Sequence, residues 1–200
     1  MPFNVNTFKS QGLVYGGTRP SLFSISLIPP GGIGIDNVSV QKFSFVARAA
    51  ELPASEVASF DVPYFGRKIK LSGDRTFSDW RVTIMNDEDF SVRSLFEAWS
   101  NAINRMVANV RDPAAAGEAY KTQLEVMQYA KDGQLIRSYF LVGAFPTVID
   151  AIPLDWNSTN AIEEFAVTFS YDYWIPNVES SSFKAGGVNL YAGRASSGSP

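Results

Sequence analysis

Residues 165–173 read Phe-Ala-Val-Thr-Phe-Ser-Tyr-Asp-Tyr, an alternation of large apolar residues with small or polar ones. A strand points successive side chains to opposite faces, so this stretch predicts a strand with one buried face. The same period of two appears at 23–28 and at 80–85, where Trp80, Val82 and Ile84 share one side. The fold is therefore expected to be built on strands.

The connections between the strands indicate antiparallel pairing. Residues 131–134, Lys-Asp-Gly-Gln, separate two apolar runs at 120–130 and 135–145, and Asp-Gly is a strong two-residue hairpin signal. Further strands are expected at 68–72 and at 38–49, where a shift in apolar phase between Val40 and Phe43 suggests a bulge. About seven strands without regular alternation with helices predict a mainly β fold, an antiparallel β-sandwich or partial barrel.

One segment has clear helical spacing. It begins near Ser91, a plausible N-cap, and ends before Asp112-Pro113. Its apolar residues recur every three or four positions: Val92, Leu95, Phe96, Trp99, Ile103, Met106, Val107 and Val110. We expect a single α-helix that flanks the sheets, with Trp80, Phe96, Trp99 and Phe165 in the core.

Turn-forming residues divide the chain. Residues 1–18 are predicted to be an N-terminal arm, 19–175 a single β domain, and 176–200 a flexible extension rich in Ser and Gly. Inside the domain, Pro53, Pro63 and Gly66 indicate a long loop over 50–66. Long loops in compact domains are usually functional or disordered.

The composition limits the classes of function. Hydrophobic residues make up 46% and charged residues only 18%, which fits either extensive subunit contacts or a β-rich monomer with a large core. A net charge of −3 disfavours nonspecific DNA binding, which depends on Lys and Arg. The longest apolar runs fall well short of the ~20 residues that span a bilayer, so no membrane anchor is expected.

Catalytic, cofactor and metal sites are all expected to be absent. The chain has no Cys and no His, so neither a Ser-His-Asp nor a Cys-His arrangement is possible, and His is the commonest general base and metal ligand. Asp87-Glu88-Asp89 fits either a divalent cation site or, with better odds, favourable charge at a helix N-terminus. The Gly-rich run 31–34 resembles a phosphate loop only weakly, because a strand rather than a helix is expected to follow. A glycosidase would need two carboxylates facing each other across a cleft, and no pair is marked as such.

Residues 67–70, Arg-Lys-Ile-Lys, place three positive charges beside the predicted long loop. This run is either a patch that faces a partner or a solvated strand face. Acidic residues nearby in the sequence offer partners for it across subunits, and exposed pairs of that kind contribute ~0–1 kcal/mol each. The candidates for contacts between subunits are Glu51, Glu56, Asp61, Arg67, Lys68, Lys70, Asp74 and Arg75.

The run 73–88, Gly-Asp-Arg-Thr-Phe-Ser-Asp-Trp-Arg-Val-Thr-Ile-Met-Asn-Asp-Glu, resembles the tail tube proteins of contractile, T-even-type bacteriophages. Blocks at 67–71, 128–132, 154–158, 165–169 and 172–174 resemble the same family and occur in its order. The residues that carry the motif are Gly73, Asp74, Arg75, Trp80, Asn86, Asp87, Asp155, Trp156, Asp172, Tyr173 and Trp174.

The resemblance implies a structural protein of the virion and no enzymatic activity. It implies homo-hexameric rings stacked into a helical tube, enclosed by the tail sheath protein and joined to baseplate and tail terminator proteins. A tape measure protein would occupy the lumen, and DNA would pass through it without specific binding during genome ejection. Assembly is expected in the cytoplasm of the bacterial host. The alternative is the inner tube of a phage-derived contractile injection or type VI secretion system.

Overall fold

The computed structural model describes residues 4–13, 16–31 and 33–177, so most of the predicted extension 176–200 lies outside the described residues. Two helices of the body are α2 (Asn37–Val46) and α3 (Ser91–Ile103), and short turns form α1 (Val5–Thr7), η1 (Phe8–Gly12) and η2 (Pro113–Ala115). The strands are β1 (Phe23–Leu27), β2 (Ala47–Ala50), β3 (Glu56–Tyr64), β4 (Arg67–Thr76), β5 (Trp80–Met85), β6 (Thr122–Tyr129), β7 (Leu135–Ile149), β8 (Glu164–Ser170) and β9 (Tyr173–Asn177). None of the helices in these ranges is long and apolar enough to cross a bilayer.

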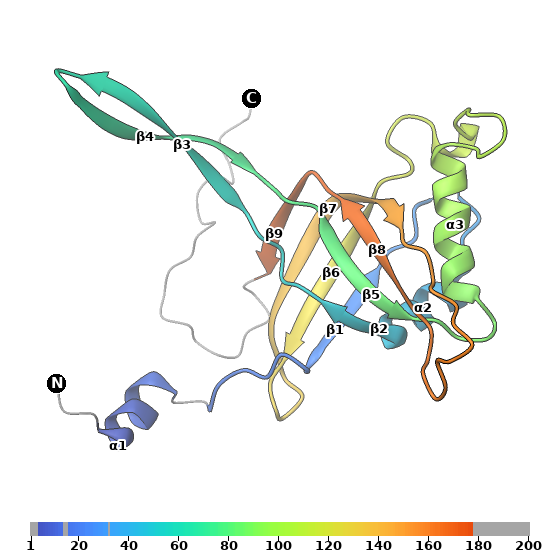
Figure 1. Cartoon of the computed structure of the whole chain (residues 1–200), viewed down its shortest axis with the longest axis horizontal. Helices are drawn as coiled ribbons and strands as arrows, with labels where there is room; N and C mark the ends of the chain where they lie inside the picture. The colour runs from blue at the N-terminus through green and yellow to red at the C-terminus, as the bar shows by residue number, and fades with distance from the viewer. Residues whose placement is uncertain (1–3, 14–15, 32, 178–200) are drawn as a thin grey trace, which may run out of the picture.

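Seven strands form one antiparallel sheet that folds over on itself (Figure 1). The order β1-β6-β7-β9 makes one layer, called layer A, and β2-β5-β8-β7 makes the other, called layer B. The strand β7 belongs to both, because its first part pairs with β6 and β9 and its last part with β8. The predicted mainly β, antiparallel, seven-stranded architecture is confirmed.

The bend that lets β7 serve both layers occurs at Gly143, which has φ +71°. The left-handed region is open to glycine and strained for other residues. A Cβ added here would also clash with the side chain of Asp172, lying 2.8 Å from its Cγ. The Asp172 carboxylate in turn accepts hydrogen bonds of 3.0 Å from Lys121 Nζ, and its amide donates to Val142 O. Glycine at this corner is therefore a requirement of the fold.

A single apolar core lies between the layers and is closed by the helices. Trp99, Phe96 and Phe43 are fully buried and pack together with Phe169 of β8 and Ile25 of β1. The predicted core residues are all buried: Trp80, Phe96, Trp99 and Phe165. The Trp99 indole also donates a hydrogen bond to Tyr120 O, so its polar atom is satisfied.

Two predicted segments differ in the structure. The expected strand 38–49 is the helix α2 followed by the short strand β2. Val40 and Phe43 are both buried, and their spacing of three, interpreted as a bulge, is one turn of a helix. The second body helix was therefore missed, and a helix does follow the Gly-rich run 31–34. The expected loop 50–66 contains β3, so that prediction was also wrong.

The boundaries of two further elements were also wrong. The helix α3 ends at Ile103, and its N-cap position is Phe90, while the Asp89 carboxylate accepts from the Ser91 amide. The chain then turns back over 104–112, where Asn109 has φ +48° and Arg105 pairs with Asp112 at 2.8 Å. The strand expected at 165–173 is interrupted after Ser170, and its last part becomes β9 in the other layer.

Candidate functional site

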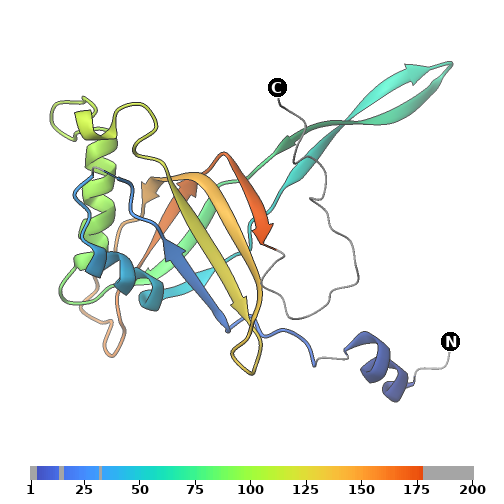
Figure 2. The same ribbon diagram turned by 180° about the vertical axis from the view of Figure 1, so that it is seen from behind.

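The most prominent surface feature is the β3–β4 hairpin, which leaves the body as an isolated two-stranded ribbon (Figure 1, upper left; Figure 2). It continues the direction of β2 and β5 beyond the edge of the sheet. Every residue of the ribbon except Gly73 is exposed. Because a two-stranded ribbon with no layer packed on it is only marginally stable in water, this hairpin needs a partner.

The register of the hairpin gives it one apolar and one charged face. Directly opposed residues share a face, and the pairs Phe60↔Leu71 and Val62↔Ile69 lie on the side that also carries Tyr64. These five side chains remain 37–61% exposed. Neighbouring apolar side chains that remain exposed together on one face are typical of a surface that contacts another protein. We call these five residues the apolar hairpin face. The sequence did not predict it, because 50–66, which contributes three of the five, was expected to be a loop beside the predicted strand 68–72.

The opposite face carries the predicted charges Asp61, Lys68 and Lys70, whereas Arg67 lies opposite Tyr64 on the apolar side. The opposite face includes the pairs Asp61↔Lys70 and Pro63↔Lys68, and Lys68 Nζ lies 3.6 Å from Asp61 Oδ2 within the same hairpin. Arg75 donates to Ser55 Oγ at 3.4 Å. The other six candidates form no ion pair with a described residue: Glu51, Glu56, Arg67, Lys70, Asp74 and Arg75 itself. Their charges are free to meet a neighbouring molecule.

The tip of the hairpin is a two-residue turn, Phe65-Gly66, with φ of +43° and +80°. Positive φ at both positions is the type I′ geometry that favours Asn-Gly or Gly-Gly. A phenylalanine there is conformationally unfavourable, and its ring is 91% exposed against the edge of Tyr64, 4.6 Å between ring centroids. Local folding does not explain an aromatic residue at this place, whereas a contact outside the chain does.

Two motif tryptophans fix the base of the hairpin. Trp80 Nε1 donates to Glu51 O at 2.6 Å, and Trp174 Nε1 donates to Ala54 O at 3.0 Å. Both bonds hold the segment that leads into β3. Gly73 faces Ala58 at a register shift, and a Cβ there would lie 3.2 Å from Ala58 O. These motif residues therefore set where the hairpin leaves the body.

The acidic cluster before α3 has a structural role, because it connects the start of α3 to α2. Lys42 of α2 lies between Asp87 Oδ2 at 2.5 Å and Asp89 Oδ2 at 2.7 Å. The hydrogen bond from Lys42, followed by that from the Ser91 amide, lowers the pKa of Asp89 to about 2. Lys42 also lowers the pKa of Asp87, and the Asp87 carboxylate raises the pKa of Lys42. The amine occupies the place of a cation, and no group of three acidic side chains within the described ranges is arranged to hold a metal.

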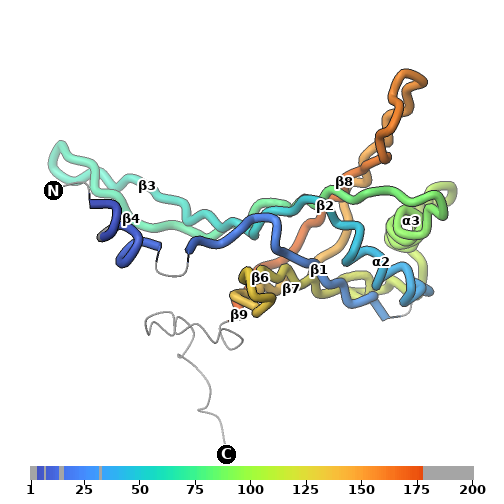
Figure 3. The backbone as a smooth tube through the Cα atoms, turned by 90° about the horizontal axis from the view of Figure 1, so that it is seen from below, coloured from blue at the N-terminus to red at the C-terminus, as the bar shows by residue number. Residues whose placement is uncertain are grey.

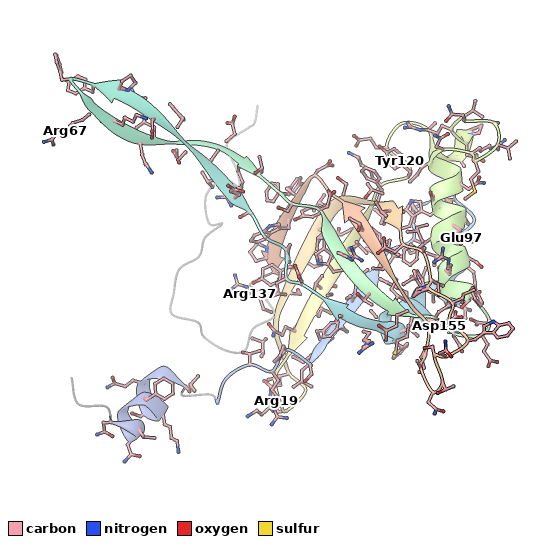
Figure 4. All side chains as sticks on the ribbon, viewed as in Figure 1. Arg19, Arg67, Glu97, Tyr120, Arg137 and Asp155 are labelled. Carbon is pink, nitrogen blue, oxygen red and sulfur yellow. The ribbon has the colours of Figure 1, made fainter. Side chains whose placement is uncertain are left out.

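The remaining motif residues lie apart from the hairpin. Asn86 joins β5 to Glu163 through its backbone and its side chain. Asp172 forms the Gly143 corner, and Tyr173 begins β9 on the uncovered side of layer A. Asp155 and Trp156 lie in the β7–β8 loop, at the end of the body away from Arg67 at the hairpin tip (Figure 4). The motif residues therefore lie at several separate contacts and surfaces and do not form one site.

Within the described residues, three strands of the seven-stranded sheet have an unpaired edge: β1 bonds only to β6, β9 only to β7, and β2 only to β5. Beside β1, a hollow of about 660 Å³ is lined by residues of β1, β6 and the α2–β2 junction, among them Phe23, Phe45 and Arg48. Unpaired edges are sites for strand addition. Layer A therefore has a free edge at each side.

Comparison with known proteins identifies the family. The family model described as "Phage tail tube protein" matches residues 18–177. The tail tube protein gp19 of Enterobacteria phage T4 is 36% identical over 159 residues, which cover 78% of this chain and 90% of that protein. The chain belongs to the phage tail tube protein family. The relatives from phages T4 and T6 are both tail tube proteins, so this member is a structural tail tube subunit and not an enzyme.

Solved structures agree on the fold. A chain in the structure of the anti-feeding prophage baseplate superposes with a TM-score of 0.52 at 11% identity, covering 78% of this chain and 91% of that one. A chain of the sheath/tube terminator of an extracellular contractile injection system, PVC, superposes with a TM-score of 0.51 at 16% identity, covering 80% and 96%. At these identities the similarity shows a shared fold alone.

Proposed function

We propose that this tail tube subunit forms hexameric rings that stack into a helical tube, and that the lumen of the tube conducts DNA into the host. The observation that carries the proposal is the projecting hairpin with its exposed apolar face, which requires a partner outside the chain. The free edges of layer A supply a second contact in a different direction, as a tube requires. Both the ring and the stack would use heterologous contacts, in which two different surfaces of the subunit meet. Such contacts form closed rings or extend into open filaments.

Within a ring, β1 of one subunit is proposed to pair with β9 of the next. Layer A has these two strands as its free edges, so repeated pairing would join the layers of all subunits into one closed barrel. Closure removes the exposed edges that would otherwise promote aggregation. Strands then run along the tube, at a tilt, and pairing runs around it.

The side of layer A away from the core is the proposed lumen surface. The register places on it Ser24, Ser26, Glu125, Met127, Phe140, Val142, Tyr173 and Ile175. This set has one acidic residue and no Lys or Arg. By contrast, the outer side of layer B has Arg48 and Arg81, each paired with an acidic residue. A surface without positive charge lets a polyanion slide without binding.

Between rings, the hairpin is proposed to reach the next ring, because it extends well beyond the body in the direction of the layer B strands β2 and β5 (Figure 2). The apolar hairpin face would provide most of the binding free energy. The predicted charged residues, Arg67, Lys68 and Lys70 with Glu51, Glu56, Asp61, Asp74 and Arg75, would set the register, since exposed ion pairs contribute ~0–1 kcal/mol each.

The proposed partners follow from this position in the tail. They are the sheath, baseplate and tail terminator proteins outside and at the ends, and a tape measure protein in the lumen, with assembly in the host cytoplasm. Solved relatives come from baseplate and sheath/tube terminator complexes, which supports the first three. The similarity to injection-system tubes keeps a non-phage injection tube as the second candidate, and the greater identity to phage T4 favours the phage tail.

Negative-stain electron microscopy of the purified chain, alone and with baseplate, tests the proposal. Hollow tubes with an axial repeat of rings are expected. A chain that remains monomeric at high concentration in both conditions would refute it. A tube whose layer A faces outward in a cryo-electron reconstruction would refute the assignment of the lumen.

A further inference from the structure

We propose that loop 151–162, between β7 and β8, is a docking site on the outside of the tube for the protein layer that surrounds it. The loop projects from layer B in the direction opposite to the free side of layer A (Figure 3, top right). If layer A lines the lumen, this loop is a radially outward part of the subunit. The inference thus rests on the proposed function, and it assigns a surface to a partner that the tube proposal leaves without one.

The loop presents three large apolar side chains to solvent. Trp156 is fully exposed, Leu154 is 80% exposed and Ile162 is 67% exposed. A buried tryptophan is among the strongest contributors to protein interfaces, and an exposed tryptophan with two further exposed apolar side chains in one loop is typical of such a contact. No fold requirement explains Trp156, because its side chain is in contact with almost nothing in its own chain.

Local hydrogen bonds hold Trp156 in this position. Asp155 Oδ1 accepts from the Asn157 amide at 2.9 Å and from Asn157 Nδ2 at 3.1 Å, and Asp155 O accepts from the Ser158 amide at 3.1 Å. Asp155 therefore closes the backbone turn that carries Trp156. A turn that is already formed loses less backbone entropy on binding, which favours the affinity of the residue that it presents.

The charge around the loop selects the chemistry of the partner. Residues 151–171 contain no Lys or Arg, while Asp155, Glu163 and Glu164 carry negative charge. Arg48 neutralises Glu164, which leaves Asp155, next to Trp156 in the chain, and Glu163, directly after the loop, as the acidic residues of this segment without a basic partner among the described residues. The partner should present an apolar cleft for Trp156 with a basic rim. Neighbouring copies are poor candidates, since the ring uses the edges of layer A and the stack uses the hairpin, both in directions different from this loop.

Co-sedimentation with assembled tubes tests the assignment, with the sheath protein encoded in the same phage genome as the probe. Tubes of the Trp156→Ala variant should form as in the wild type but bind the sheath protein at least about 30-fold more weakly, as expected for a central aromatic anchor. Trp156→Phe should restore most of the binding. The matched control is Val107→Ala, which removes an equally exposed apolar side chain at 104–112 and should keep full sheath binding.

Three outcomes overturn the inference. Trp156→Ala tubes that bind the sheath normally would show that the loop is no anchor. Loss of the tubes themselves in Trp156→Ala would show that the loop joins copies of this chain. Equal losses of sheath binding in Val107→Ala and Trp156→Ala would show a nonspecific effect. Absence of tubes in the wild type would instead refute the proposed function, so the two failures are distinguishable.

Discussion

Replacing Phe65 with asparagine separates the folding of the hairpin from its role in stacking. Phe65 occupies the first central position of a type I′ turn at φ +43°, where most side chains cost ~1–2 kcal/mol. Asparagine tolerates this region, and Asn-Gly is the favoured sequence for the turn. The variant should therefore fold at least as well as the wild type, and thermal unfolding of the unassembled chain should show an unchanged or higher midpoint.

Assembly should respond in the opposite direction. The Phe65 ring is 91% exposed, so nearly all of the ~1.5–3 kcal/mol available from burying a phenylalanine would come from a neighbouring ring. A loss of ~2 kcal/mol per subunit corresponds to roughly 30-fold in affinity. Contacts around a ring act together, so the critical concentration for tube growth should rise by at least this factor.

The assay is sedimentation of tubes across a concentration series, with electron microscopy of the pellets. Phe65→Leu is the matched control, because it keeps an apolar side chain on the same strained backbone and should polymerise nearly normally. If the asparagine variant formed tubes at the wild-type critical concentration, the tip would make no stacking contact. If it failed to fold, the argument about turn geometry would be wrong.

Three further variants examine other parts of the structure. Gly143→Ala should lower the free energy of unfolding by ~2–4 kcal/mol, measured by urea denaturation, because the new Cβ combines a left-handed φ with a steric clash; wild-type stability would refute the corner. Lys68→Glu with Lys70→Glu should impair tube polymerisation and change its dependence on salt, and unchanged tubes would exclude these charges from stacking. The lowered pKa of Asp89, about 2 against 3.8, means that the bridge to Lys42 stabilises the fold above pH 4 and that this contribution is lost as the pH falls towards 2. Lys42→Met should therefore make the urea midpoint less dependent on pH between 5 and 2, and an identical pH profile would show that the bridge has no such role.

Strands whose partner lies within the chain could be predicted from the sequence. The stretches at 80–85 and 165–170 alternate cleanly, because one side faces the core and the other faces solvent. The helix α2 could not be distinguished from a bulged strand, since a spacing of three between Val40 and Phe43 fits both. The end of α3 was missed for a related reason: Met106 and Val107 continue the apolar spacing but are exposed, so the pattern does not mark burial.

The sequence predicted which segment carries the candidate contact surface, but not that this surface is largely apolar. The charges at 67–70 were visible, and the structure places them on the hairpin, but the apolar face beside them was not recognised. Alternation in Phe60, Val62 and Tyr64 was present in the sequence, yet Pro63 and Gly66 suggested a loop. An isolated ribbon tolerates proline because one side of each strand has no partner. A strand whose apolar side chains become buried only against another molecule is harder to predict from the sequence than a strand of the core.

The path of β7 has a mechanical consequence. This 15-residue strand begins in layer A, bends at Gly143 and ends in layer B, directly before the outward loop. A pull on that loop along the last part of β7 would load the ladder with β8 in shear, because its hydrogen bonds lie perpendicular to the strand, and the backbone would carry the force through Gly143 into layer A. Peeling, which breaks such bonds one at a time, would require a pull in another direction. Force applied at the outside of the subunit would thus be shared by the two layers before either could separate.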